Sequence, residues 1–109
     1  MVFTGDLGIV GKEMLVKLIK DHGIKDPGEH YEDCGALIYD RKRQKTNAGG
    51  SGCGCCASVL CAYILPGIAA GKWKKVLFVP TGALMSKVSF NEQCTVPGIA
   101  QAIVLEREE

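Results

Sequence analysis

The sequence lacks any marked excess of charge of one sign. Its 109 residues include 13 Lys and Arg against 12 Asp and Glu, which gives a formal net charge of +1. A protein that binds nucleic acid through its phosphates needs a clear basic excess, so we expect no nucleic-acid partner. The short basic cluster at residues 41–45 follows Asp40 and is typical of a solvated turn.

Long apolar runs are lacking as well. The longest candidate, from Cys55 to Ala70, is interrupted by Pro66 and Gly67 and falls short of the roughly 18 residues that span a bilayer. Met1 leads into VFTGD instead of a basic segment and an apolar run, so we expect no signal peptide. Because the chain begins almost inside an expected strand, we also expect residues 1–109 to be a single segment of a longer protein.

The usual cysteine frameworks are missing too. Six cysteines are present, but three crowd into residues 53–56 and the others are scattered, which favours a reduced, cytosolic setting over disulfides. The paired C-x-x-C motifs of a zinc site are absent, so we expect no metal, and nothing indicates a cofactor. A nucleophile would need a base, and the two histidines, His22 and His30, fall where we expect surface residues.

What is present is a globular composition, with 47% hydrophobic and 23% charged residues. Apolar periodicity predicts a helix over 7–22, with Asp6 as its N-terminal cap and Gly23 as its stop. Strands are predicted at 1–4, 36–39, 46–48, 76–79 and 98–105. With a second helix over 55–70, this order predicts a layered α/β fold with helices packed on a mixed sheet.

Two of these elements carry almost no polar residues. The helix at 55–70 is apolar nearly all round, and the strand at 76–79 has no polar alternation, so we expect both to be buried on all sides. We expect Pro66 to kink or split the helix, since proline removes a backbone hydrogen bond. The connection over 82–97 is long enough to suggest a functional loop.

The most unusual stretch is NAGGSGCGCC, residues 47–56, directly ahead of the second helix. Its glycines permit positive φ and close approach, and the helix directs backbone N–H groups towards it. It lacks the Lys-Ser/Thr pair of a Walker loop and is no dinucleotide-binding motif. Two interpretations remain open: tight packing of the helix start on the sheet, or a site for an anion or acyl group.

The cysteines around this stretch divide into two groups. Cys53 lies in the glycine turn, where it could line a site, and Cys34 and Cys94 fall in connections that could approach it. The thiols on the second helix are expected to be small core residues: Cys55, Cys56 and Cys61. These residues favour a binding cleft over a complete catalytic site.

Five segments keep the order of one known family: TGDLGIVG (4–11), DCGALIYD (33–40), AGGSGCGCCASVL (48–60), VLFVPTGALMS (76–86) and VPGIAQAIVLE (96–106). They closely resemble the C-terminal part of the stage V sporulation protein AD family, almost end to end. The resemblance implies a thiolase-like layered fold built from two similar halves. This chain would be the C-terminal part of one half and roughly the last third of the protein.

The resemblance also implies a function in spore formation. The family binds dipicolinic acid, a planar pyridine with two carboxylates, and supports its uptake into the developing spore. Expected partners are other stage V sporulation membrane proteins, on the cytoplasmic side and peripheral to the spore inner membrane. Combined with the residue chemistry, this predicts a ligand site at Ser51, Gly52, Cys53, Gly54 and Gly82, where backbone amides donate to carboxylate oxygens.

The chain departs from the catalytic pattern of the thiolases. They carry His-Pro-x-Gly where this chain has residues 50–54, so the general base is absent and we expect a non-catalytic binding module. The alternative is an acyl-transferring thiolase or ketoacyl-synthase-like enzyme that acts on coenzyme A thioesters. Gln101 stands where the family tends to have His, and Lys87 where it has Pro. An incomplete fold leaves apolar surface uncovered, so we expect self-association or pairing with the missing thiolase half.

Overall fold

The fold is built on a mixed four-stranded sheet with the strand order β2-β1-β3-β6. The computed structural model describes residues 1–25, 27–83 and 98–108. Its elements are β1 Val2–Thr4, α1 Gly8–Asp21, η1 Gly28–His30, β2 Tyr31–Asp33, α2 Cys34–Leu37, α3 Arg41–Gln44, α4 Cys55–Val59, η2 Leu60–Ile64, α5 Leu65–Ala69, β3 Lys75–Val79, β4 Thr81–Ala83, β5 Gly98–Ala100 and β6 Ile103–Glu106. β1 is parallel to β2 and β3, and β6 is antiparallel to β3, so the predicted mixed α/β sheet is confirmed.

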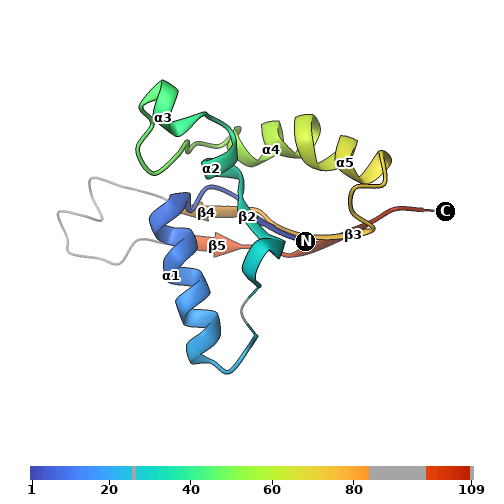
Figure 1. The fold of residues 1–109 in the computed structure, drawn as a ribbon, viewed down its shortest axis with the longest axis horizontal. Helices are drawn as coiled ribbons and strands as arrows, with labels where there is room; N and C mark the ends of the chain where they lie inside the picture. Colours follow the sequence, from blue (N-terminus) through green and yellow to red (C-terminus); the bar gives the residue numbers. More distant parts are fainter. Residues whose placement is uncertain (26, 84–97, 109) are drawn as a thin grey trace.

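Helices lie on both sides of this sheet. Figure 1 shows α1 on one side of the strands and the α4–α5 helix on the other. The core forms on the second side, where Phe3 and Phe78 stand next to each other on β1 and β3. The buried residues of the helix that pack in this core are Cys55, Val59, Ile64 and Ile68. The glycine turn therefore begins a helix that is anchored on the centre of the sheet.

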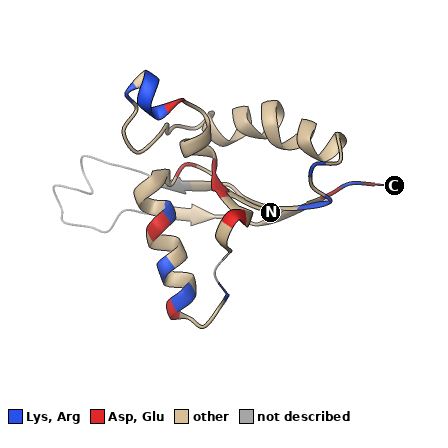
Figure 2. Ribbon diagram, in the orientation of Figure 1, with Lys and Arg blue, Asp and Glu red and all other residues tan. Residues whose placement is uncertain are grey.

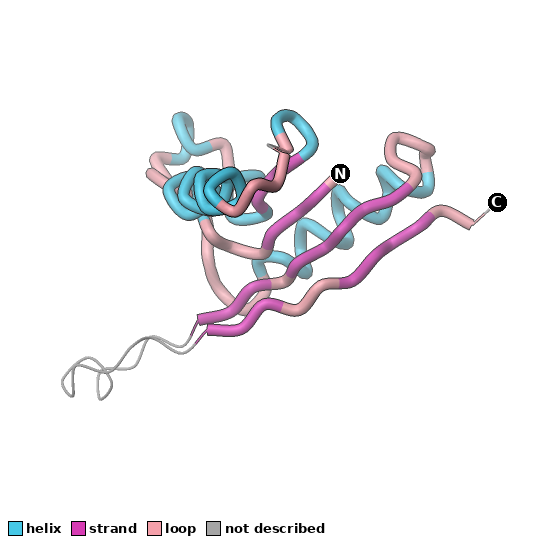
Figure 3. The backbone as a smooth tube through the Cα atoms, turned by 90° about the horizontal axis from the view of Figure 1, so that it is seen from below, coloured by secondary structure: helices cyan, strands magenta, loops and turns pink. Residues whose placement is uncertain are grey.

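The last strands form one long hairpin with a break in each arm. Figure 3 shows β3 continuing into β4 alongside β5 and β6. Pro80 interrupts the first arm, and the N–H of Gln101 donates to the Pro80 carbonyl at 3.3 Å. The single strand predicted over 98–105 is therefore divided in two. Most of the predicted loop, with Lys87 and Cys94, lies outside the described residues.

Two predicted strands are wrong. Residues 36–39 do not form a strand, because Asp33 accepts a hydrogen bond from the Ala36 N–H and caps the short helix α2. The strand of this region is β2, which ends at Asp33. Residues 46–48 are not extended either: they follow the short helix α3, and Asn47 has a φ of 52°, which does not fit a strand.

The second predicted helix is present and is interrupted ahead of Pro66. Its middle turn, η2, is a π-helix between the α-helical segments α4 and α5. Pro66 has no N–H to donate, and a wider turn before it accommodates the missing bond. The predicted burial on all sides is wrong, because Tyr63 is 40% and Leu65 44% exposed on the outer side of this helix.

The central strand β3 also keeps one open side. Val76 and Phe78 are buried, whereas Leu77 between them is 37% exposed, so the predicted burial of both faces is wrong. Leu77 lies opposite Val104 of β6, which is 63% exposed. The outer stripe of α1 is also open, with Val10, Met14 and Leu18 54–67% exposed. Among the described residues, the face of the sheet under the α4–α5 helix is well covered. Apolar surface remains exposed on the other face of β3 and β6 and on α1.

Candidate functional site

A fully buried carboxylate, Asp33, organises the ends of β1 and β2. Its Oδ1 accepts hydrogen bonds from the Thr4 hydroxyl at 2.5 Å and from the Leu7 N–H at 3.0 Å. Its Oδ2 accepts from the N–H groups of Gly8 at 2.9 Å and Ala36 at 3.2 Å. One side chain thus satisfies the first N–H groups of both α1 and α2, where a negative charge is stabilised.

Asp6 was predicted to cap α1, and this prediction is wrong because Asp33 takes that role. The Asp6 carboxylate lies instead against the glycine turn. Its Oδ2 accepts from the Ser51 hydroxyl at 2.8 Å and from the Gly52 N–H at 3.2 Å. Its Oδ1 accepts from the Thr81 hydroxyl at 3.4 Å. Three segments far apart in the sequence therefore meet at one carboxylate.

The first two glycines of the turn serve packing. The Gly50 N–H donates to the Gly35 carbonyl at 2.6 Å, and the Gly35 N–H donates to the Gly5 carbonyl at 3.1 Å. A Cβ at Gly50 would lie 2.6 Å from Ile38 Cγ2, and a Cβ at Gly49 would collide with the Gly35 carbonyl. Gly49 and Gly50 are therefore tightly packed, as one interpretation predicted, but their close neighbours belong to α2 and the residues after it instead of the predicted sheet.

The last two glycines lie in a different environment. A Cβ added at Gly52 or Gly54 would meet nothing within 4 Å, and Gly52 has a φ of 126° that favours glycine. Ser51, Gly52, Cys53 and Gly54 are all exposed. This half of the turn is accessible and presents a hydroxyl and backbone N–H groups. The ligand-site assignment for these four residues stays a prediction.

The thiols near the turn differ sharply in exposure. Cys34 and Cys55 are buried together in the core, where burial is the main cause that raises the pKa of Cys34 to about 12 and also raises that of Cys55. Both therefore remain protonated thiols at neutral pH. Cys53 is exposed. Cys61 is exposed too, so its prediction as a core residue is wrong; it lies on the open side of the helix. Cys56 is half-buried.

Gly82, the remaining predicted site residue, lies in β4 opposite Ile99 of β5. Its neighbour Thr81 is the residue that reaches Asp6, and the sequence analysis missed it. A Cβ at Gly5 would lie 2.6 Å from the Thr81 N atom, so Gly5 makes this close approach possible. The available signal was a threonine two residues after the strand predicted at 76–79, near the strand end where α/β folds gather polar groups.

Proton-transfer and metal groups are sparse around the turn. His22 and His30 are exposed, as predicted, and His22 Nδ1 lies 2.9 Å from the Leu18 carbonyl at the end of α1. Within residues 1–25, 27–83 and 98–108, no three His, Cys, Asp or Glu side chains gather to hold a metal ion. In the same ranges, every helix is too short or too polar to cross a bilayer. The described geometry thus offers anion-binding donors and an exposed thiol.

Comparison with known proteins shows the family to which the chain belongs. The family model for stage V sporulation protein AD matches residues 1–106, which include Asp6, the glycine turn and Thr81. The chain belongs to the stage V sporulation protein AD family. Stage V sporulation protein AD of Bacillus subtilis (strain 168) is 39% identical over 107 residues, which cover 98% of this chain and 31% of that protein. The chain thus spans about a third of its curated sporulation relative.

Proposed function

We propose that this chain supplies one wall of a dipicolinate site in a non-catalytic sporulation protein, which supports uptake of dipicolinic acid into the developing spore. The observation that carries the proposal is the Asp6 carboxylate, held by Ser51 Oγ and Gly52 N. The turn already binds a carboxylate from its own chain, so its donors have suitable spacing for one from a ligand. Membership of the stage V sporulation protein AD family supports the sporulation setting.

Dipicolinate matches the open half of the turn in shape and charge. One ligand carboxylate takes the place of the Asp6 carboxylate on Ser51 and Gly52. The exposed backbone of Gly52 and Gly54 leaves room for the flat ring, since a Cβ at either position would meet nothing within 4 Å. Cys53 lies between these glycines in the sequence and is exposed, so its thiol is accessible to the same ligand. The Thr81 hydroxyl, 3.4 Å from Asp6, adds a further donor next to Gly82.

In this proposal the Asp6 carboxylate competes with the ligand carboxylate for the Ser51 and Gly52 donors. A dicarboxylate that approaches the turn meets the negative charge of Asp6 and must replace its hydrogen bonds. Binding therefore depends on how readily the Asp6 side chain leaves Ser51 and Gly52. Its partial exposure and its contact with exposed residues make that displacement feasible, in contrast to a fully buried carboxylate.

Isothermal titration calorimetry with dipicolinate tests the site. Ser51→Ala should weaken binding by about tenfold to a hundredfold, the loss expected for one hydrogen bond to a charged group. Ser58→Ala is the matched control, because Ser58 is also exposed but donates to the Gly54 carbonyl of its own helix at 2.7 Å. Unchanged affinity in both Ser51→Ala and Cys53→Ala would reject the site.

The exposed Cys53 thiol keeps the acyl-transfer alternative testable on the same chain. Incubation with acetyl-coenzyme A followed by mass spectrometry distinguishes the two functions. An acyl adduct on Cys53 that is lost in Cys53→Ala would favour an acyl-transferring enzyme. Its absence, together with dipicolinate binding, would favour the binding module.

The open apolar surfaces favour a partner for this chain. We propose that the part of the family protein outside these residues covers the exposed Leu77 and Val104 of the sheet. The assembled protein would then lie on the cytoplasmic side of the spore inner membrane, with other stage V sporulation membrane proteins as partners.

Sedimentation of the chain alone should show self-association, because exposed Leu77, Val104 and the stripe of α1 are not covered. A monomer at high concentration would contradict this.

A further inference from the structure

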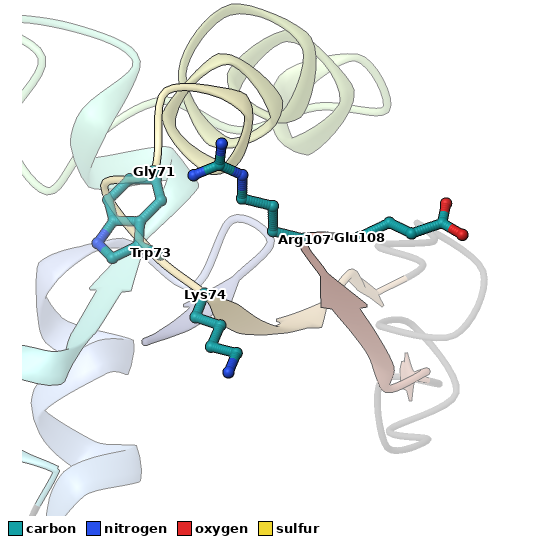
Figure 4. Close-up of a pocket in the computed structure, with 5 residues that line it drawn as sticks. All are labelled: Gly71, Trp73, Lys74, Arg107 and Glu108. Carbon is teal, nitrogen blue, oxygen red and sulfur yellow. The ribbon is translucent and has the colours of Figure 1, made fainter.

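A cavity lies at the opposite end of the α4–α5 helix from the glycine turn. It has a volume of about 470 Å³ and is lined by Gly71, Trp73, Lys74, Arg107 and Glu108. Figure 4 shows the Trp73 indole and the Arg107 guanidinium at the Gly71 turn, with the Glu108 carboxylate directed away from them. The glycine turn precedes Cys55, whereas Gly71 follows the helix end at Ala69, so the two sites are separate.

The aromatic wall of this cavity is fixed by packing. Trp73 makes edge-on contacts with Phe3 and Tyr63, with ring centroids 5.2 and 5.4 Å away. A Cβ at Gly67 would lie 2.5 Å from the indole, so the ring rests directly on α5. An indole held in this way loses little freedom when a ligand packs against it.

The basic wall is positioned by the sheet. The Arg107 N–H donates to the Lys74 carbonyl at 3.0 Å and extends the pairing of β3 with β6 by one step. The Arg107 side chain lies over Gly71, where a Cβ would come within 2.8 Å of Nη1. Among the residues that the structure describes, neither Arg107 nor Lys74 forms an ion pair. With respect to residues 1–25, 27–83 and 98–108, the guanidinium is therefore available to an anion.

The surrounding charge also favours an anion. Figure 2 shows basic residues at the turn between α5 and β3 and again after β6. Lys72 lies 4.8 Å from the Trp73 ring centroid and donates to the Tyr63 hydroxyl at 2.9 Å. Two carboxylates are close by: Glu106 lies 3.9 Å from Lys75, and Glu108 lines the cavity but is directed away from Trp73 and Arg107 in Figure 4. This end of the molecule thus combines a rigid indole with a positive potential.

We propose that this cavity binds a small aromatic carboxylate. The ligand ring packs against Trp73, and its carboxylate forms a two-pronged pair with the Arg107 guanidinium, which is planar and matches a carboxylate in geometry. Lys72 and Lys74 add long-range attraction. The indole favours a flat ligand over a simple oxyanion such as phosphate. This site does not depend on the dipicolinate site proposed at the glycine turn.

Tryptophan fluorescence gives a direct test, because Trp73 is the single tryptophan of the chain. Benzoate should change its emission saturably, and the neutral analogue benzamide should not. Arg107→Gln should weaken benzoate binding at least about tenfold, as expected when a charge-assisted pair is lost. Arg43→Gln is the matched control and should leave binding unchanged, since Arg43 is exposed and does not line the cavity. It belongs to α3, which Figure 1 shows near the α4 end of the second helix, whereas the cavity follows α5.

The outcomes separate the proposal from its alternatives. A linear response shared by benzamide, or a benzoate affinity that survives Arg107→Gln, overturns it. Competition by inorganic phosphate as strong as by benzoate overturns the aromatic part. Arg107→Lys keeps the charge but loses the two-pronged pair, so it should bind with intermediate affinity if Arg107→Gln fails to fold. Dipicolinate binding that is sensitive to Ser51→Ala and not to Arg107→Gln belongs to the glycine turn.

Discussion

Asp33 and Asp6 are two carboxylates near the same strand ends, and their surroundings assign them opposite roles. Asp33 is fully buried and accepts from three backbone N–H groups and one hydroxyl, so its charge is part of the fold. Asp6 is partly buried and binds Ser51 and Gly52, which are exposed. The difference teaches that accessibility of the donors, more than the carboxylate itself, separates a structural contact from one that a ligand can replace.

The largest effect that sharpens this comparison is expected from Asp33→Ala. It leaves the N–H groups of Leu7, Gly8 and Ala36 unpaired, in a place where water has little access. We expect a loss of about 3–5 kcal/mol in the free energy of unfolding, measured by urea titration. Asp6→Ala is the control and should cost less than about 1 kcal/mol. Equal losses for the two variants would contradict the assigned roles.

The glycines of the turn divide in the same way, and the next effect tests that division. Gly50→Ala forces a Cβ against Ile38 and Tyr39 and should cost about 1–3 kcal/mol of stability. Gly54→Ala meets open space at a φ of −96° and should be neutral or slightly stabilising, by up to about 1 kcal/mol. Thermal unfolding of both variants checks this. A destabilising Gly54→Ala would show that the open half of the turn is packed after all.

Cys34, next to Asp33, extends the comparison to pH. Its ordinary pKa of 9.0 rises to about 12 in the folded chain, mainly because it is buried and also because Asp33 is close. Below pH 9 the thiol is protonated in both states and has no effect. Between about pH 9 and 12 only the unfolded chain releases this proton, so stability should fall by about 1.4 kcal/mol per pH unit. Urea titrations at rising pH should show a smaller slope in Cys34→Ala, and an identical slope would contradict the shift.

The sequence predicted the two longest helical regions, the mixed sheet and the glycine turn, because these depend on local periodicity and on glycine spacing; the short helices α2 and α3 were not predicted. It failed at residues 36–39 because the apolar run GALIY has the composition of a strand. In the structure the buried Asp33 side chain caps a helix there instead. The site was half predictable. Ser51–Gly54 follow from composition, but Asp6 and Thr81 join them only through tertiary contacts across 45 and 75 positions of the chain.

The smallest expected effect concerns Asp6 and decides whether it competes with the ligand. Asp6→Asn keeps the side-chain shape and removes the charge that repels a dicarboxylate, so dipicolinate should bind about fivefold more tightly, a change of about 1 kcal/mol. Calorimetry measures it, and the gain should disappear in the Asp6→Asn, Ser51→Ala double variant, because the Ser51 hydroxyl, held less strongly by an amide than by a carboxylate, is the donor that the ligand takes over. Weaker binding in Asp6→Asn would mean that the carboxylate contributes to the site, for example through a bound cation, and the competition would be rejected. Asp6 and Asp33 would then both have roles that no ligand replaces, and the two carboxylates would differ only in how deeply they are buried.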